Sequence, residues 1–174
     1  MIEWIVFILG STFIIWYSLP SLRQPGSHGF YRFFVWEIIL GLFVLNVRLW
    51  FAQPFAWYQF ISWFLLVISI IPVVAGISLL HSAGKPEGNF EATTQLVTQG
   101  IYRFIRHPLY ASLLYLTWGI FFKSPSLLKG CLAAIANAFL YSTGRADETE
   151  CLVKFGQAYS GYMKTTKRFI PFIL

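Results

Sequence analysis

The length of the apolar segments constrains this chain more than any other feature. Three predominantly apolar stretches, at residues 2–19, 30–51 and 55–80, fill most of its first half. A helix needs about 20 apolar residues to cross the hydrocarbon core of a bilayer. We therefore predict that each stretch crosses a membrane as a helix. Pro20 is expected to end the first helix, and Pro72 is expected to kink the third.

The composition agrees with a membrane protein and excludes an ordinary soluble domain. The chain is 57% hydrophobic and 11% charged, whereas soluble domains carry about 25% charged residues. Its net charge of +6 would suggest nucleic acid in a soluble protein, but here the basic residues lie at the ends of apolar segments. We expect no nucleic-acid partner. Cys131 and Cys151 form no CxxC motif and no His/Cys cluster, so no metal site is predicted.

The second half holds two shorter apolar runs, at residues 109–122 and 127–143, which a short polar turn joins. We predict a helical hairpin that is tilted or does not fully span the bilayer. The polar tail at residues 145–174 carries apolar side chains at helical spacing: Leu152, Phe155, Tyr159 and Tyr162. This spacing predicts a separate amphipathic helix whose apolar stripe faces the membrane or the core. The fold class is thus all-α, a polytopic membrane helix bundle with about five transmembrane segments.

The basic residues also predict the topology. With five segments and the N-terminus outside, ten of the 13 lysines and arginines lie on the cytoplasmic side, as the positive-inside rule requires. These are Arg23, Arg32, Lys85, Arg103, Arg106, Arg145, Lys154, Lys164, Lys167 and Arg168, while Arg48, Lys123 and Lys129 lie outside. The polar segments at residues 81–108 and 144–174 therefore share the cytoplasmic face.

Arg106, His107 and Pro108 stand at a predicted helix start. Proline suits the first helical position, where a missing N–H costs nothing. The N–H groups that follow and the helix dipole favour an anion, and His107 can donate or accept a hydrogen bond near neutral pH. Two interpretations remain open: an anion-binding edge, or a cluster that caps a helix at the membrane interface.

Several other charged residues have a structural and a functional interpretation. Asp147, Glu148 and Glu150 form either a solvated patch or a site for a cation or ribose hydroxyls, and Arg145 either pairs with them or faces an anionic substrate. Glu37, inside an apolar segment, is a functional candidate or a satisfied structural group. The basic run at residues 164–168 fits attraction to anionic lipid headgroups.

A wider pattern links these residues. It resembles the isoprenylcysteine carboxyl methyltransferase and phospholipid methyltransferase superfamily, over roughly residues 80–174. The matching residues are Leu96-Val97-x-x-Gly100-x-Tyr102-x-x-x-Arg106-His107-Pro108-x-Tyr110, then Asp147-Glu148, then Phe155-Gly156-x-x-Tyr159-x-x-Tyr162, then Arg168-x-x-Pro171. The resemblance implies an integral membrane enzyme that uses S-adenosylmethionine. It divides the chain into N-terminal transmembrane helices at residues 1–80 and a catalytic region at residues 81–174, within one membrane domain.

The resemblance also implies a cytoplasmic cofactor pocket formed by the C-terminal half. His107 and Tyr110 would line it, and Leu96, Gly100 and Tyr102 would contribute backbone and packing contacts. The acceptor would be a lipid or a lipidated substrate that enters from the bilayer.

The resemblance implies that two charged residues act in catalysis. Glu148 matches the second acid of the family's Glu-Glu pair, with Asp147 in place of the first, and Arg145 resembles the arginine that often precedes the pair. We predict Arg145 and Glu148 as catalytic. Arg106 would face the cofactor's carboxylate, and Glu148 its ribose or ammonium group. A carboxylate or thiolate acceptor needs no base, whereas an ammonium must first lose a proton, to Glu148 or Glu37.

Two other functions compete with this one. The chain could be a non-catalytic membrane lipid-binding protein that keeps only the fold. It could also be a membrane reductase of the sterol-reductase type, which would bind a nicotinamide cofactor. The sequence specifies neither the methyl acceptor nor the oligomeric state.

Overall fold

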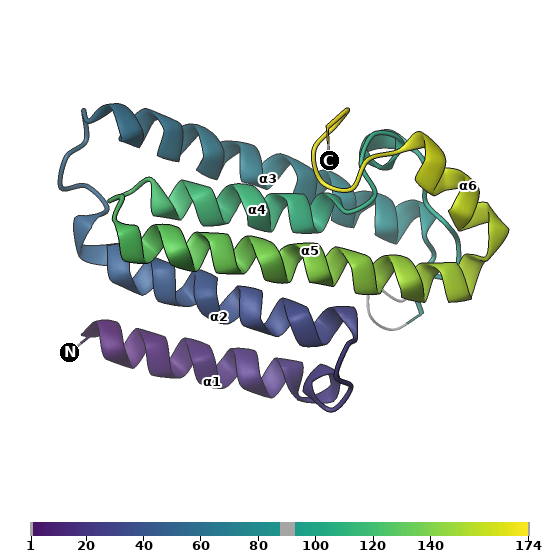
Figure 1. The fold of residues 1–174 in the computed structure, drawn as a ribbon, viewed down its shortest axis with the longest axis horizontal. Helices are drawn as coiled ribbons and strands as arrows, with labels where there is room; N and C mark the ends of the chain where they lie inside the picture. Colours follow the sequence, from purple (N-terminus) through teal and green to yellow (C-terminus); the bar gives the residue numbers. More distant parts are fainter. Residues whose placement is uncertain (1, 88–92, 174) are drawn as a thin grey trace. The chain divides into compact units, whose positions relative to one another are not determined.

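A computed structural model describes residues 2–87 and 93–173 of the chain. Within these ranges the chain is helical and contains no strand, which confirms the predicted all-α class. The elements, in chain order (Figure 1), are α1 (Ile2–Leu22), α2 (His28–Asn46), the 3-10 helix η1 (Val47–Leu49), α3 (Trp57–Ala83), the 3-10 helix η2 (Gly100–Arg103), α4 (Pro108–Phe121), α5 (Leu127–Phe155) and α6 (Gln157–Thr165).

Three stretches are long and apolar enough to cross a membrane: Ile2–Leu22, His28–Leu49 and Trp57–Ala83. They correspond to the three N-terminal segments expected from the sequence. Helix α4 has 14 residues, which is about 21 Å at 1.5 Å per residue and less than the roughly 30 Å of a hydrocarbon core. The total of five segments and the orientation in the membrane stay predictions.

Two helix ends differ from the sequence prediction. Pro20 lies inside α1, which continues to Leu22. A proline removes one backbone hydrogen bond, and near the exposed end of a helix the freed carbonyl can still reach water or lipid headgroups. The second apolar segment was predicted to reach residue 51, but α2 ends at Asn46 and tightens into η1.

The C-terminal tail also differs from its prediction. Instead of a break near residue 144, α5 continues through residue 143 to Phe155. Gly156 then adopts a φ of 56°, a left-handed conformation that glycine takes without a steric penalty. The predicted amphipathic helix is therefore divided, with Leu152 and Phe155 on α5 and Tyr159 and Tyr162 buried on α6.

The chain forms two compact units. Unit 1 comprises Met1–Val67 and Leu114–Asp147, and unit 2 comprises Ile68–Leu113 and Glu148–Leu174. The predicted division at residue 80 stays a prediction. The core of unit 1 centres on the buried side chains of Leu42, Ile120 and Ala133. Larger apolar side chains pack around them: Ile38, Ile39, Phe43, Trp50, Leu66, Leu116, Trp118, Phe121 and Leu132.

Unit 1 also buries two lysines at the turn between α4 and α5. Lys123 is 1% exposed, and its Nζ lies 3.1 Å from Gln59 Oε1 and 3.5 Å from the centre of the Trp63 ring. Lys129 Nζ donates to Asn46 Oδ1 at 3.0 Å. These contacts fix the turn against α2 and α3 through neutral acceptors and an aromatic face.

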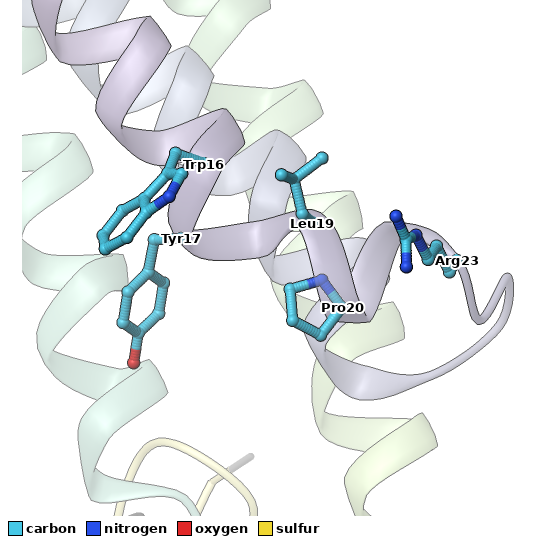
Figure 2. Close-up of a pocket in the computed structure, with 5 residues that line it drawn as sticks. All are labelled: Trp16, Tyr17, Leu19, Pro20 and Arg23. Atoms are coloured by element: carbon cyan, nitrogen blue, oxygen red, sulfur yellow. The ribbon is translucent and has the colours of Figure 1, made fainter.

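The outer helix of unit 1 bears an interfacial signature at its C-terminal end. Figure 2 shows a pocket there whose lining residues are Trp16, Tyr17, Leu19, Pro20 and Arg23. Aromatic rings beside an arginine at the end of an apolar helix are typical of the boundary between hydrocarbon and headgroups. The composition of this end of α1 is therefore the one expected at a membrane interface.

Candidate functional site

The site in unit 2 is built around the start of α4. The helix begins at Pro108, as the sequence predicted, and Ala111 N donates to His107 O at 2.9 Å. A close approach to α3 holds this start in place. A Cβ at Gly76 would lie 2.6 Å from Leu109 Cδ1 and 3.1 Å from Pro108 Cγ. Any side chain at this position would therefore force Leu109 to shift.

A C-terminal segment of residues 166–169, which we call the C-terminal strap, runs beside the residues that precede α4. Arg106 N donates to Lys167 O at 2.8 Å, and His107 N donates to Arg168 O at 3.1 Å. Lys167 N donates to Phe104 O at 3.1 Å. These bonds join the strap and residues 104–107 as two short parallel segments, so both backbones hold each other in one register.

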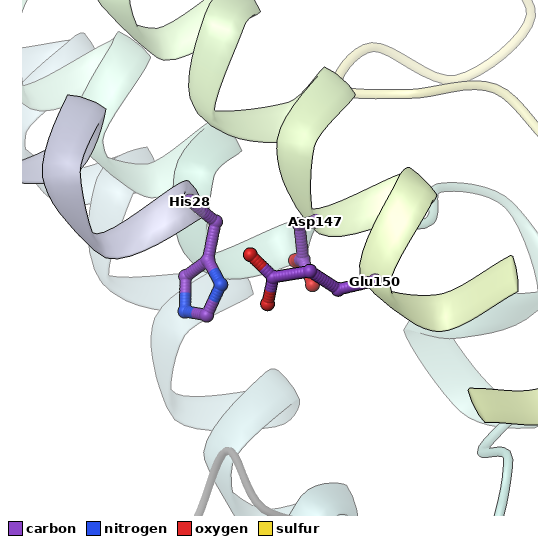
Figure 3. Close-up of side chains that lie close together, drawn as sticks. All are labelled: His28, Asp147 and Glu150. Carbon is purple, nitrogen blue, oxygen red and sulfur yellow. The ribbon is translucent and has the colours of Figure 1, made fainter. Parts of the chain in front are cut away.

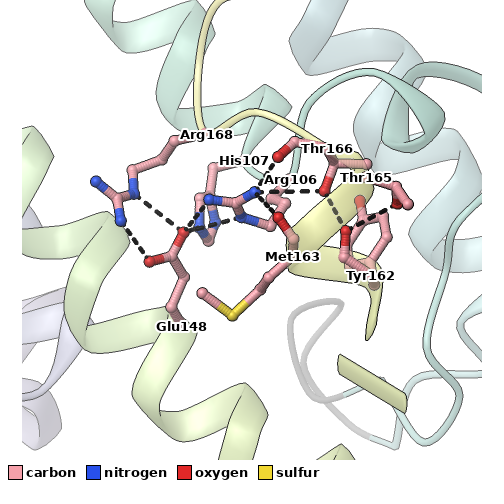
Figure 4. Close-up of polar contacts among 8 residues, drawn as sticks. All are labelled: Arg106, His107, Glu148, Tyr162, Met163, Thr165, Thr166 and Arg168. Atoms are coloured by element: carbon pink, nitrogen blue, oxygen red, sulfur yellow. Dashed lines mark hydrogen bonds and ion pairs between the residues drawn. The ribbon is translucent and has the colours of Figure 1, made fainter. Parts of the chain in front are cut away.

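Glu148 on α5 is the centre of the charged contacts. Its Oε1 accepts from Arg106 Nε at 2.9 Å and from Arg168 Nε at 3.0 Å, and its Oε2 accepts from Arg168 Nη2 at 2.6 Å. His107 Nε2 lies 3.5 Å from Oε1. Figure 4 shows the carboxylate between the two guanidinium groups. One carboxylate thus joins three residues that lie 20 to 42 positions away in the sequence.

The charge state of Glu148 follows from these neighbours. Burial by itself raises the pKa of the carboxyl group, since water no longer stabilises the anion. The contacts with His107, Arg168 and Arg106 outweigh burial and hold the pKa far below its usual range. Glu148 is therefore a carboxylate at any physiological pH. A group with such a low pKa is a weak general base.

The guanidinium of Arg106 is occupied by protein groups. Its side chain is 8% exposed. Beyond Glu148, its Nη1 donates to the carbonyl oxygens of Met163, at 3.2 Å, and Thr166. Arg106 therefore ties α6 and the strap to Glu148 and brings one full positive charge to the start of α4.

The ring of His107 lies in an aromatic setting. It stacks on Tyr110, with ring centres 5.3 Å apart and planes 24° apart, and it tilts against Phe169, 6.0 Å away. All three side chains are buried. Tyr110 follows His107 by one helical turn, which is why the two rings meet on the same side of α4.

The 3-10 helix η2 supplies the remaining predicted contacts. Tyr102 is buried, and its carbonyl accepts a hydrogen bond from the Tyr162 hydroxyl at 2.5 Å. Burial raises the pKa of Tyr162, so its hydroxyl stays neutral and keeps this donor. Gly100 opens η2 with a φ of 59°. Leu96, nearby in the sequence, is half-buried.

The structure thus brings four predicted site residues into one cluster: Arg106, His107, Tyr110 and Glu148. Arg145 lies on α5 three residues before Glu148 and is exposed. Asp147 and Glu150, which Figure 3 draws with His28, lie three residues apart on α5 and share one side of that helix.

Sequence reasoning missed the contribution of the strap. The sequence predicted that the whole basic run at residues 164–168 attracts lipid headgroups. The two lysines of that run, Lys164 and Lys167, are exposed, but Arg168 pairs with Glu148. Phe169 was not singled out. The one available signal was the spacing Arg168-x-x-Pro171, which belongs to the family resemblance.

A comparison with known protein families finds a match over the part of the chain that contains most of this site. A family model described as phospholipid methyltransferase matches residues 57–157, more than half of the sequence. Neither curated proteins nor solved structures gave a match. The matched range contains α3, η2, α4 and α5, and it ends before the C-terminal strap.

Proposed function

The chain belongs to the phospholipid methyltransferase family, and from this premise we propose that it is an integral membrane methyltransferase that uses S-adenosylmethionine. The proposed acceptor is a lipid or a lipid-anchored group that enters from the bilayer. The observation that carries the proposal is that the family match contains Arg106, His107, Tyr110 and Glu148, whose side chains meet at one helix start.

The residues at the start of α4 fit the chemical groups of this cofactor. Its sulfonium cation suits aromatic faces, which the buried rings of Tyr102 and Tyr110 offer. Its carboxylate suits a helix N-terminus with positive charge beside it. When bound, the cofactor supplies an electrophilic methyl group. We propose His107, Tyr110, Leu96, Gly100 and Tyr102 as residues that hold it.

Charged residues complete the proposed pocket. Arg106 and Glu148 would border the cofactor with their charges paired to each other, so that neither leaves an unpaired buried charge. Arg145, exposed on α5, stays a predicted catalytic residue on the acceptor side. An in-line methyl transfer needs mainly alignment and the exclusion of water, and buried side chains around His107 serve the second need.

The low pKa of Glu148 bears on the acceptor. A carboxylate or thiolate acceptor attacks the methyl group without losing a proton, whereas an ammonium group must be deprotonated first. Glu148 would be a poor base for that step. The cluster therefore supports an acceptor that arrives as an anion better than one that relies on Glu148 for deprotonation.

Calorimetry in detergent tests cofactor binding. Wild type is expected to bind S-adenosylmethionine, and His107→Ala is expected to bind it about tenfold more weakly, as loss of one polar contact costs on the order of 1.5 kcal/mol. The control is His81→Ala, an exposed histidine in the last turn of α3, which should bind like wild type. A wild-type protein that binds NADPH instead, or neither compound, would overturn the proposal.

Labelled methyl donor identifies the acceptor class. Purified protein is incubated with a prenylated cysteine carboxylate, a thiol and phosphatidylethanolamine in separate vesicles. Incorporation into the carboxylate or the thiol is expected to exceed incorporation into the ammonium headgroup. No incorporation into any acceptor or membrane extract would favour the non-catalytic lipid-binding protein.

A further inference from the structure

We propose that Arg168 is a positioning residue: it fixes the Glu148 carboxylate, and through it the His107 ring and the start of α4, in the geometry that the methyl donor requires. This inference rests on the function proposed above, and it assigns a role to a residue that lies beyond the family match. Arg168 itself is 20 residues from Glu148 in the sequence.

The guanidinium of Arg168 contacts both carboxylate oxygens of Glu148. Arg168 places Nε 3.0 Å from Oε1 and Nη2 2.6 Å from Oε2 of Glu148. A guanidinium that binds both carboxylate oxygens fixes the plane of the carboxylate as well as its position, which the point charge of a lysine cannot do. The side chains of Arg168 and Glu148 are 16% and 6% exposed, so water screens this contact little.

The carboxylate that Arg168 binds also contacts the two residues before α4. Oε1 also accepts from Arg106 Nε at 2.9 Å and lies 3.5 Å from His107 Nε2. Rotation of the carboxylate would move Oε1 away from both groups. Arg168 thus acts on Arg106 and His107 through the carboxylate that all three residues share.

Backbone hydrogen bonds also connect the strap to the residues before α4. Lys167 O and Arg168 O accept from the N–H groups of Arg106 and His107, and the next strap residue, Phe169, packs its ring against His107. The strap therefore contacts His107 at its backbone and at its ring, and the carboxylate that the strap binds lies 3.5 Å from the Nε2 atom of His107. Three constraints on one residue are the supporting shell that a precise site requires.

The neighbouring Lys167 provides a matched control. It carries the same charge one position earlier in the strap, but its side chain is exposed. We therefore compare Arg168→Gln, Arg168→Lys and Lys167→Gln in the full-length protein in detergent. Gln removes one positive charge at either position, so a difference between the two Gln variants reflects the contact with Glu148 and not the net charge.

Amide hydrogen exchange without cofactor tests the connection itself. Arg168→Gln is expected to lower the protection of the Arg106, His107 and Lys167 amides, whereas Lys167→Gln is expected to leave it unchanged. Equal protection in the two Gln variants would overturn the proposal. This measurement is independent of the methyl donor, so a wild type that binds no donor would refute the proposed function while the exchange data still decide whether Arg168 holds the start of α4.

Donor binding and turnover test the positioning role. In Arg168→Gln the dissociation constant for S-adenosylmethionine should rise about tenfold to roughly a hundredfold, the size of the effect in metal sites when a residue that orients a ligand-holding group is replaced. The KM for the donor should rise more than kcat falls, and Arg168→Lys should recover part of the loss. Wild-type affinity in a folded Arg168→Gln variant would overturn the proposal. If that variant does not fold, wild-type affinity in Arg168→Lys would do so.

Discussion

The two units bury charge in opposite ways. In unit 2, the Glu148 carboxylate lies between the guanidinium groups of Arg106 and Arg168, at 2.6 to 3.0 Å. In unit 1, Lys123 is equally buried but is held by Gln59 Oε1 at 3.1 Å and by the face of Trp63 at 3.5 Å. The first cluster balances full charges with full charges, and the second surrounds a cation with neutral groups.

The two clusters should therefore respond differently to mutation: the Glu148 cluster is a network of mutually balanced charges, whereas Lys123 is a single buried cation. When one member of a buried ion pair is removed, the other is left without compensation, which costs far more than the pair contributes. A cation among neutral acceptors leaves no opposite charge behind when it is replaced by an apolar side chain. Unit 2 should therefore tolerate neutral substitutions in its cluster poorly, and unit 1 should tolerate them well.

The largest effect is expected from Glu148→Gln. It removes the charged group that Arg106 and Arg168 both contact in a largely buried cluster, so the free energy of unfolding should fall by about 3–5 kcal/mol. Thermal unfolding in detergent measures the change. Glu150→Gln, an exposed acid two residues further along α5, is the control and should have little effect. Similar melting temperatures for both variants would contradict a charge-balanced network.

Acid should remove the same contribution gradually. Because the folded state holds the pKa of Glu148 below its unfolded value, the stabilisation is complete above the unfolded pKa of about 4.3. It is then lost as pH falls toward the folded pKa, by about 1.4 kcal/mol for each pH unit. The stability difference between wild type and Glu148→Gln should be constant from about pH 5 to about pH 8, where Glu148 is ionised in both the folded and the unfolded state, and should shrink near about pH 3. A difference that grows with acid would contradict this sign.

The smallest effect is expected from Lys123→Met. The cation–aromatic contact is worth about 0.5–2 kcal/mol, but the substitution also removes the cost of burying a charge, so the net change should stay within about 1 kcal/mol. Chemical unfolding in detergent measures it, with the exposed Lys164→Met as control. A loss as large as that of Glu148→Gln would show that both clusters are networks.

Much of the helical layout was predictable because it depends on local patterns. Apolar length predicted three helices that are long enough to span a membrane, and Pro108 predicted the start of α4. The failures occurred where a local signal was overridden. Pro20 did not end α1, and a polar stretch did not end α5, which stops only where Gly156 takes a positive φ.

The site was predictable only in part, for a related reason. Arg106, His107, Tyr110 and Glu148 could be named because they form a recognisable spacing, and the structure brings them together. Their partners could not be named in this way. A charge on an amphipathic tail, such as Arg168, has the same sequence signature whether it faces lipid headgroups or a buried carboxylate.

The sequence by itself determined the membrane character, the helical class and the family, because hydrophobic length and motif spacing are properties of the chain alone. Only the tertiary structure decided that Glu148 is shared by Arg106 and Arg168 and that Lys123 lies against Trp63. Burial and ion pairing depend on which segments meet. Segments that meet across 20, 42 or more residues are selected by the packing of the whole fold.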